Sequence, residues 1–300
     1  MTMRVLVTGK EGQVDTSLQA LADKSPLDIE LIRIGLPEID LSKPDTLDAV
    51  VRAAKPDVII SSAAYTAVDK AESEPELAEA INGHGPQRLA QLAAELEVPI
   101  LHLSTDYVFA GDKDGIYSET DGPAPVSVYG RTKLLGEELI RQATPDHVIL
   151  RTAWVYSPYG NNFVKTMLRL GSTRDEINVV ADQRGSPTYA PEIARALLSV
   201  AQRVVADRDE NLRGTFHLTA QGETSWAGFA EAIFEGAAAR GGKKVKVNPI
   251  ATADYPTPAK RPLNSRLNGE KLLATYGLKL APWQESLSDC LDIIIEKAEA

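Results

Sequence analysis

A tyrosine and a lysine four residues apart, Tyr129 and Lys133, are the side chains of this sequence best suited to move a proton. Positions i and i+4 of a helix share one face, so the phenol and the ammonium would lie side by side. A free tyrosine has a pKa of about 10, and a neighbouring cation in a site sheltered from water lowers that pKa by stabilising the phenolate. Thr105 precedes Tyr129 by 24 residues and adds a hydroxyl group. The three residues predict an acid–base site in which Tyr129 transfers the proton and Lys133 lowers its pKa.

Two glycines near the beginning of the sequence, Gly9 and Gly12, have the arrangement of a dinucleotide-binding turn. They follow an apolar run at residues 5–7 and precede apolar residues at helical spacing. In such a unit the first glycine permits the tight turn and the second lets the backbone approach a pyrophosphate. The free N–H groups of the helix then face the anion. Asp15 stands where a third glycine would complete the fingerprint, so the motif is incomplete.

The elements that must position these residues alternate between strand and helix. Apolar runs predict strands at residues 5–7, 29–34, 57–60, 99–103 and 147–150, and helical periodicity predicts helices at 44–54, 79–96 and 127–142. Repeated strand–helix units form a right-handed, doubly wound parallel sheet, which binds ligands at the carboxyl ends of its strands. We therefore predict an α/β Rossmann sheet whose binding edge carries Gly9, Ala63, Thr105 and Thr152.

Beyond residue 151 the pattern is looser and predicts a smaller α/β lobe. Helices are expected at 163–171, 192–204, 226–239, 269–276 and 285–297, with short strands at 177–181, 215–218 and 245–250. We assign residues 1–151 to a dinucleotide-binding domain and 152–300 mainly to a substrate-binding lobe. Segments from about 177 to 218 are expected to return to the Rossmann sheet.

Charge and cysteine content limit the partners and the cellular compartment that this sequence suits. The net charge of −10 argues against nucleic acid and anionic membranes as partners, so an anionic substrate would need a local basic patch. Lys260, Arg261 and Arg266 lie at or near a proline-rich loop, where they form either a phosphate contact or a solvated basic face. Cys290 is the single cysteine, which excludes an intramolecular disulfide and fits a reducing cytoplasm. The early first strand leaves no room for a signal peptide, and no apolar run is long enough to cross a membrane.

Together the glycine turn, Thr105 and the Tyr129–Lys133 pair resemble the extended short-chain dehydrogenase/reductase family. Within it, nearly the whole chain resembles the dTDP-4-dehydrorhamnose reductases, which complete dTDP-L-rhamnose synthesis. The resemblance is carried by residues 9–14 (GKEGQV), 63–72 (AAYTAVDKAE), 104–109 (STDYVF), 151–156 (RTAWVY), 160–163 (GNNF), 182–188 (DQRGSPT) and 255–262 (YPTPAKRP). It implies reduction of the C4 keto group of a nucleotide sugar, dTDP-4-dehydro-L-rhamnose, with NADPH or NADH.

The resemblance also implies roles for single residues. Tyr129 would protonate the C4 oxygen as a hydride arrives at C4, Lys133 would hold the nicotinamide ribose, and Thr105 would donate a hydrogen bond to the same oxygen. The implied cofactor contacts, besides Tyr129 and Lys133, are Gly9, Gly12, Gln13, Val14, Asp40, Leu41, Ala63, Ala64 and Tyr65. The implied substrate contacts are Thr105, Asp106, Tyr107, Trp154, Lys260 and Arg261. Asp106 could equally cap a turn, and Trp154 could be a core aromatic.

Several alternatives remain at the level of sequence. A dehydratase is disfavoured because Thr105 is followed by Asp106 and Tyr107 and not by the Asp-Glu pair of nucleotide-sugar 4,6-dehydratases. Another nucleotide-sugar 4-reductase, a 4-epimerase, or a non-catalytic partner similar to the regulatory subunit of methionine adenosyltransferase stays open, as does a homodimer. Some relatives depend on magnesium, so magnesium is possible here, but no metal-ligand spacing supports a site and we assign no metal ligands. We interpret His102 and His147 as core residues.

The strand at residues 29–34 bears on the choice of cofactor. NAD-selective sites place a carboxylate at the end of this strand, where it binds the adenosine ribose. Here Arg33, Ile34 and Gly35 stand at that place, and no acidic residue follows until Glu38. We therefore expect NADPH to be used at least as well as NADH.

Overall fold

Six parallel strands form the central sheet of the computed structural model, which describes residues 2–24 and 28–299. Their order across the sheet is β10-β5-β4-β3-β1-β2. The strands are β1 (Met3–Thr8), β2 (Ile29–Ile34), β3 (Val58–Ser61), β4 (Ile100–Thr105), β5 (His147–Thr152) and β10 (Gly214–His217). Every residue of β3 and β4 is buried, as expected for inner strands that are covered on both faces.

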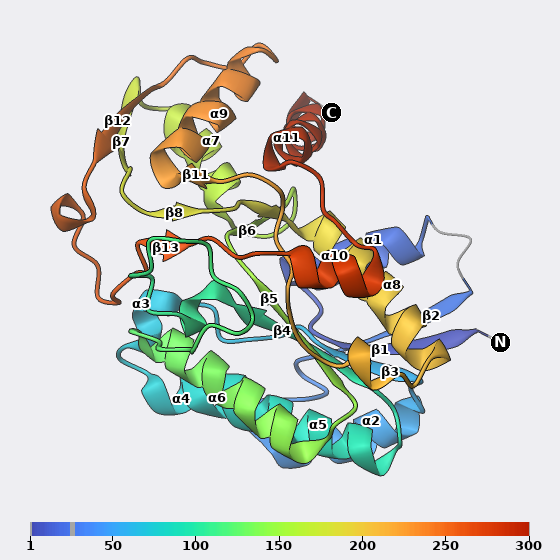
Figure 1. Cartoon of the computed structure of the whole chain (residues 1–300). Coiled ribbons are helices and arrows are strands. Elements are labelled where there is room, and N and C mark those ends of the chain that lie inside the picture. The colour runs from blue at the N-terminus through green and yellow to red at the C-terminus, as the bar shows by residue number, and fades with distance from the viewer. Residues whose placement is uncertain (1, 25–27, 300) are drawn as a thin grey trace.

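Helices cover both faces of this sheet, because successive side chains of a strand point to opposite sides. Val5 and Val7 of β1 pack into a core with α1 (Gln13–Ala22) and α8 (Ala190–Ala206). Leu6 packs into a second core on the other face. That face is covered by α2 (Leu47–Ala54), α5 (Gly85–Glu95) and α6 (Val128–Ala143). Figure 1 shows these two layers on either side of the strands, which confirms the doubly wound α/β fold.

The order of the strands places a ligand-binding crevice at the ends of β1 and β3. The chain runs from β1 to β2 on one side and then crosses to β3 on the other side of β1. Thr8, the last residue of β1, lies beside Ile34 on one side and Ser61 on the other. Ligands of open α/β sheets bind at such a switch point, outside the carboxyl ends of the strands. The glycine turn follows β1 directly and therefore lies at this crevice.

The helix expected at residues 79–96 is interrupted. The short helices α3 (Val68–Ala71) and α4 (Pro75–Glu79) lead into a π-helical turn, Ala80–His84, and then into α5. Apolar periodicity gives no sign of this turn, because the apolar residues that predict the helix, from Leu89 to Leu96, lie after it. Such turns are frequent near functional sites. Asn82 of this turn, which is fully buried, hydrogen-bonds the loop after β3.

A second, smaller group of helices and strands lies at the carboxyl edge of the large sheet. Its hydrophobic core joins α7 (Phe163–Gly171), α9 (Trp226–Ala238) and α11 (Trp283–Glu299) to a pair of parallel strands, β7 (Glu176–Val180) and β12 (Lys246–Ile250). Short strands complete this part: β6 (Val155–Tyr156) with β9 (Thr188–Tyr189), and β8 (Arg184–Gly185) between β11 (Thr224–Ser225) and β13 (Asn264–Ser265).

The expectation that residues from about 177 return to the large sheet is wrong for β7. This strand pairs with β12 because its side chains alternate between exposed and buried, which suits a strand with only one covered face. Helix α8 and strand β10 do belong with the large sheet, and α10 (Glu270–Tyr276) packs near β10. Residues 152–300, less α8 and β10, remain our proposal for the second lobe; residues 1 and 300 lie outside the described part of the chain.

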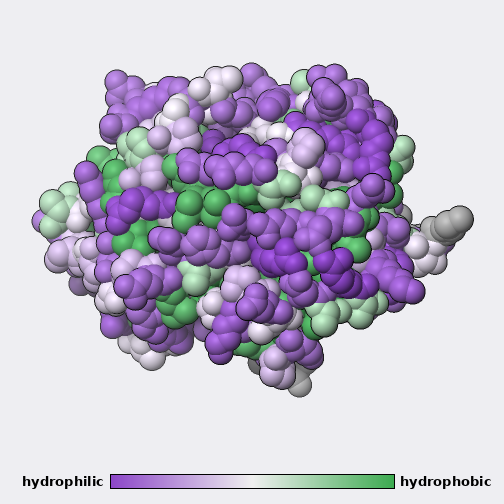
Figure 2. All heavy atoms as spheres, turned by 90° about the horizontal axis from the view of Figure 1, so that it is seen from below, coloured by the Kyte–Doolittle hydropathy of each residue, from purple (hydrophilic) through white to green (hydrophobic). Residues whose placement is uncertain are grey.

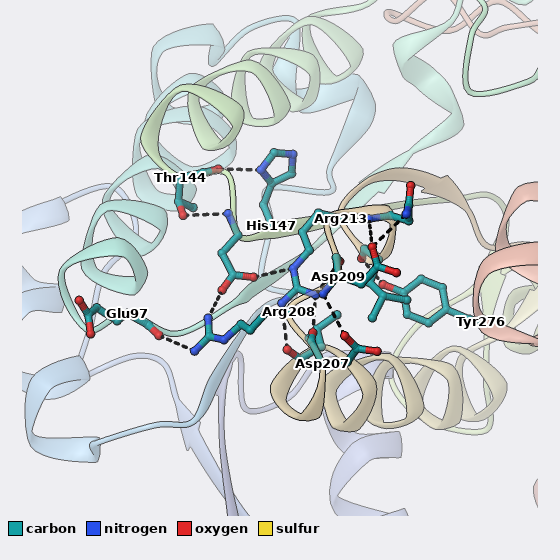
Figure 3. Close-up of polar contacts among 12 residues, drawn as sticks. Glu97, Thr144, His147, Asp207, Arg208, Asp209, Arg213 and Tyr276 are labelled. Carbon is teal, nitrogen blue, oxygen red and sulfur yellow. Dashed lines mark hydrogen bonds and ion pairs between the residues drawn. The ribbon is translucent and has the colours of Figure 1, made fainter.

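Ion pairs fasten this returning segment to the amino-terminal edge of the sheet, away from the crevice (Figure 3). Asp146, just before β5, accepts hydrogen bonds from Arg208 at 2.7 Å and Arg213 at 2.9 Å. His147 contacts the Thr144 carbonyl oxygen at 2.7 Å through Nδ1. Burial lowers the pKa of His147. His147 therefore has a structural role at this edge of the sheet, which lies away from the crevice.

The face formed by α2, α4, α5 and α6 is seen in Figure 2. Hydrophilic residues cover most of it, and hydrophobic residues appear in separate patches of the kind found on most protein surfaces. Within residues 2–24 and 28–299, no helix is both long enough and apolar enough to span a bilayer.

Candidate active site

The start of α6 places Tyr129 beside the end of β4. Ser127 caps the helix by accepting a hydrogen bond from the Gly130 N–H at 3.1 Å. Gly130 itself packs against the chain after β4, where an added Cβ atom would lie 2.2 Å from the carbonyl oxygen of Tyr107. A side chain at position 130 would therefore push the helix away. The glycine allows the close approach that brings Tyr129 to Thr105.

Tyr129, Thr105 and Asp106 lie together at the end of β4. Thr105 Oγ1 donates to Asp106 Oδ1 at 2.9 Å, and the Thr105 hydroxyl is close enough to the Tyr129 phenol to act on its pKa. Thr105 and Asp106 are only 5% and 3% exposed. Burial raises the pKa of Asp106 to about 6. A carboxyl group held this way can donate or accept near neutral pH.

The expected lowering of the Tyr129 pKa is wrong for this structure. Burial raises the pKa of Tyr129 above its ordinary value, and the hydrogen bond with Thr105 offsets only part of the rise. The reason is the direction of Lys133, whose ammonium group points to β4 and not to the phenol. It donates to the Leu103 carbonyl oxygen at 2.7 Å and lies 3.2 Å from His102 Nε2. Tyr129 is consequently a protonated phenol at neutral pH, as a proton donor must be.

Lys133 is itself deeply buried, with 2% of its surface exposed. Burial lowers its pKa to about 8, and the charge of Glu137 opposes this fall. At neutral pH the ammonium form still predominates. Lys133 thus provides a positive charge at the end of β4, close to the crevice.

One turn beyond Lys133, Glu137 anchors α6 to the sheet. Its carboxylate, which is fully buried, accepts hydrogen bonds from Ser104 at 2.6 Å and from Arg151 at 2.8 and 2.6 Å. Arg141 adds a contact at 2.7 Å. These pairs hold the helix in register with β4 and β5. The sequence analysis did not identify Glu137, although its i+4 spacing from Lys133 places it on the same helix face.

The glycine turn after β1 has the shape of an anion cradle. Gly9 adopts φ +117°, a conformation that side chains rarely permit. Asp15 fills the space beneath the turn: its Oδ1 atom would lie 2.6 Å from a Cβ atom added at Gly9 and 3.2 Å from one added at Gly12. The carboxylate lies 3.8 Å from Arg33 Nη2. Burial nevertheless raises its pKa.

Gln13 and Val14, the next two implied cofactor residues, have different places. The Gln13 amide oxygen accepts hydrogen bonds from Ser157 at 2.8 Å and Asn162 at 3.0 Å, which ties the glycine turn to the second lobe. Val14 is half-buried and packs against the core beneath α1. Gln13 therefore lies at the crevice between the lobes, whereas the Val14 side chain faces the core.

The loop after β3 forms the other wall of the crevice. The N–H of Ala63 donates to Thr8 Oγ1 at 3.2 Å, which ties this loop to the end of β1. The N–H of Tyr65 donates to Asn82 Oδ1 at 2.8 Å, and Asn82 also bonds Thr132 of α6 at 3.1 Å. Ala64 lies between these two anchors and is half-buried. Asn82 is a further positioning residue that the sequence analysis missed, because its π turn gave no signal.

The segment after β2 holds the remaining implied cofactor residues. Asp40 accepts hydrogen bonds from the backbone and hydroxyl of Ser42 at 3.0 and 2.6 Å, and these bonds lower its pKa. Leu41 is 8% exposed and packs against Gly85, where a Cβ atom would lie 2.8 Å from the Leu41 carbonyl oxygen. Both residues border the end of β2, where an adenine would lie in a Rossmann fold.

A pocket of about 790 Å³ lies next to the candidate site formed by Tyr129, Thr105 and Asp106. Tyr107 and Arg261 line one end of it, and Trp226 and Phe163 lie among the apolar residues of its wall. The Tyr107 ring meets that of Tyr129 edge-to-face, with centroids 5.4 Å apart. Cavities of this size accommodate small-molecule ligands. The pocket therefore begins one aromatic ring away from the proposed proton donor.

The other implied substrate residues differ in their surroundings. Arg261 lines the pocket together with Tyr107 and pairs with Asp69 at 2.6 Å, so it is held in place there. Trp154 stacks on Trp226 with centroids 3.7 Å apart. Lys260, in contrast, is exposed.

Arg266 also differs from its expected place in a basic patch. It pairs with Glu223 at 3.1 Å and donates to the Asp114 carbonyl oxygen at 2.6 Å. These contacts give it a structural place. No group of three or more His, Cys, Asp or Glu side chains in the described part of the chain is arranged to hold a metal ion.

Comparisons with known proteins agree with this geometry. Residues 3–295 match the family described as the RmlD substrate binding domain. The chain is 52% identical over 284 residues to the dTDP-4-dehydrorhamnose reductase of Sinorhizobium fredii, with 95% of each chain covered. It also matches the solved structure of a dTDP-4-dehydrorhamnose reductase from Clostridium acetobutylicum, at 40% identity and a TM-score of 0.90, covering 98% of this chain and 100% of that one.

A second solved structure connects the fold to a cofactor. The dTDP-4-dehydrorhamnose reductase of Bacillus anthracis, determined in complex with NADP, is 36% identical, with a TM-score of 0.89 over 98% of this chain and 100% of that one. The family match and the full-length relatives cover the glycine turn, the Tyr129–Lys133 pair and the second lobe together. The chain belongs to the dTDP-4-dehydrorhamnose reductase family.

Proposed function

We propose that this chain reduces the C4 keto group of dTDP-4-dehydro-L-rhamnose with NADPH or NADH and so yields dTDP-L-rhamnose. The observation that carries the proposal is the place of Tyr129, at the start of α6 and beside Thr105 at the carboxyl end of β4. The named relatives, which span nearly the whole chain, support the same activity.

The cofactor would supply a hydride to C4 of the sugar, and the glycine turn and Lys133 would hold it. The Gly9 N–H is used on the Ile34 carbonyl oxygen, so Gly9 would provide the tight turn, while Gly12, at the start of α1, would let a pyrophosphate approach the positive end of the helix dipole. Lys133 uses two of its N–H groups on Leu103 and His102, which leaves a third for a ribose hydroxyl.

Tyr129 would give its proton to the C4 oxygen as negative charge develops there. Its raised pKa keeps the proton in place before the reaction, and the alkoxide that forms is a far stronger base than a phenolate. Thr105 now donates to Asp106, so donation to the substrate oxygen requires its hydroxyl group to change partner. Asp106 would then be free to bind a sugar hydroxyl.

The pocket beside Tyr107 would take the nucleotide portion of the substrate. Arg261 lies between this pocket and the catalytic group, at a place suited to a diphosphate. The pairing of Arg261 with Asp69 fixes the guanidinium but leaves less net positive charge for the ligand. This arrangement favours a nucleotide sugar over a small, uncharged ketone.

The experiment that tests the proposal is product analysis. The purified chain is incubated with NADPH and dTDP-4-dehydro-L-rhamnose, and the sugar product is identified by NMR. We expect dTDP-L-rhamnose, with one NADPH oxidised for each sugar reduced. A 4-epimerase would change the sugar without net cofactor oxidation, and a regulatory protein would produce neither change; either result would contradict the proposal.

A further inference from the structure

A buried chain of three side chains joins two strands of the sheet to Lys133. Ser61 of β3 and His102 of β4 are register partners, so their side chains lie next to each other on one face. Ser61 Oγ lies 3.0 Å from His102 Nδ1, and His102 Nε2 lies 3.2 Å from Lys133 Nζ. Ser61 and His102 are 0% exposed. His102 therefore contacts Lys133 of the candidate site, although it lies within a core strand.

The partners of His102 determine which of its nitrogens carries a proton. A lysine ammonium only donates hydrogen bonds, so Nε2 must be an unprotonated acceptor. The proton of the neutral ring then lies on Nδ1 and is donated to Ser61 Oγ. Burial and the charges of Lys133 and Arg141 hold the His102 pKa well below its ordinary value, which keeps the ring neutral.

We propose that His102 is a positioning residue that fixes the Lys133 ammonium for cofactor binding. With the Leu103 carbonyl oxygen, it provides two acceptors that are rigidly placed by β4. Two fixed bonds leave the ammonium only one free direction for its third N–H. This inference rests on the proposed function, because it assigns the third N–H to the nicotinamide ribose.

His102 also stabilises the charged form of Lys133. An acceptor bonded to the ammonium favours that form, while burial of the same group favours the neutral amine. The other ionisable group that acts on Lys133 is Glu137, on the next turn of α6, and Arg141 lies close enough to act on His102. Loss of the His102 acceptor should therefore lower the pKa of Lys133 further.

The test compares His102→Leu with His102→Gln in NADPH binding, measured by cofactor fluorescence from pH 6 to pH 10. The Gln amide oxygen can take the place of Nε2, whereas Leu offers no acceptor. We expect Leu to weaken NADPH binding about tenfold at pH 8, as is typical for a lost hydrogen bond to a charged group, with Gln within about threefold of wild type. The loss of affinity at alkaline pH should begin at lower pH in the Leu variant.

Two further variants separate positioning from packing. In a Lys133→Met background, His102→Leu should have no additional effect on NADPH binding, because His102 acts through the lysine. His147→Leu, at the opposite edge of the sheet, should leave the pH profile unchanged. Equal, pH-independent losses in the Leu and Gln variants would overturn the proposal, as would an additive loss in the Met background.

These measurements require no sugar substrate. A chain that binds NADPH but reduces no nucleotide sugar would refute the proposed function. The response of NADPH binding to the His102 variants would still decide the role of this residue.

Discussion

Replacement of Asp15 by glycine should tighten cofactor binding while it weakens the fold. The Asp15 carboxylate lies beneath the glycine turn, where its Oδ1 atom would be 3.2 Å from a Cβ atom added at Gly12. In a complete fingerprint a glycine stands at this position. Asp15 therefore adds a negative charge close to the pyrophosphate of the cofactor.

Electrostatic repulsion from Asp15 should weaken binding of the cofactor pyrophosphate. A carboxylate about 6 Å from a phosphate oxygen repels it by roughly 3 kcal/mol at an effective dielectric constant of 20. Arg33 lies 3.8 Å from Asp15 and offsets part of this repulsion, whereas Lys10 is engaged 2.5 Å away by Glu38. We estimate a net effect of about 1 to 2 kcal/mol, so the Kd of NADPH should fall about 5- to 30-fold in the glycine variant.

The same change should destabilise the free protein. The Asp15 side chain is 4% exposed and that of Arg33 is 22% exposed. Arg33 Nη2 also donates to the Lys10 carbonyl oxygen, so the guanidinium keeps a partner when Asp15 is removed. Because burial raises the pKa of Asp15, loss of its charge alone should not destabilise the fold, and we expect a loss of about 1 kcal/mol from glycine's helix penalty.

The assay is titration with NADPH, followed by intrinsic fluorescence at low and high salt, together with urea denaturation of each variant. Asp15→Asn separates charge from shape, because it removes the charge and keeps the side chain. Glu11→Gln is the matched control: Glu11 is an exposed carboxylate in the same turn, so its removal should change affinity little. Equal or weaker NADPH binding by both Asp15 variants would refute the reasoning and make Asp15 a simple filler of the turn.

Three further outcomes are expected. Tyr129→Phe should lower kcat at least about 100-fold while the Kd of NADPH stays nearly unchanged, because only the proton donor is lost; wild-type turnover would exclude Tyr129 as the acid. Burial raises the pKa of Asp106 from 3.8 to about 6, so its ionisation costs stability as pH rises through this range. Asp106→Asn should therefore be more stable than wild type at pH 8, by up to about 3 kcal/mol, but not at pH 4; equal gains in thermal-melting experiments at both values would count against a buried carboxylate. NADPH should be used at least as well as NADH, since Gly35 leaves the end of β2 without a carboxylate; a kcat/KM preference for NADH of about tenfold or more would contradict this.

The sequence by itself determined the fold class and named the candidate residues of the site. Inner parallel strands must be apolar on both faces, so the runs that became β1, β3, β4 and β5 were recognisable without any knowledge of their neighbours. The i+4 spacing of Tyr129 and Lys133 is likewise a local property of a helix. The glycine turn was recognisable because its geometry depends on adjacent residues only.

Which distant segments pair was decided by the tertiary structure. Strand β7 was expected in the large sheet but pairs with β12, some 70 residues later, where only one of its faces is covered. A short apolar strand carries no information on its partner. The π turn with Asn82 was hidden for a different reason, because the apolar residues that predicted the helix lie after the turn and Asn82 itself is polar.

The protonation states of the candidate site residues, and the direction in which the Lys133 ammonium points, also came from the tertiary structure alone. Spacing predicted that Lys133 would lower the pKa of Tyr129, yet its ammonium points to His102, 31 positions away in the chain, and burial raises the phenol pKa instead. Asp15 is likewise paired with Arg33 across two elements. Residue types and local spacing specify which groups can react, but pKa values depend on desolvation and on partners that only the folded chain brings together.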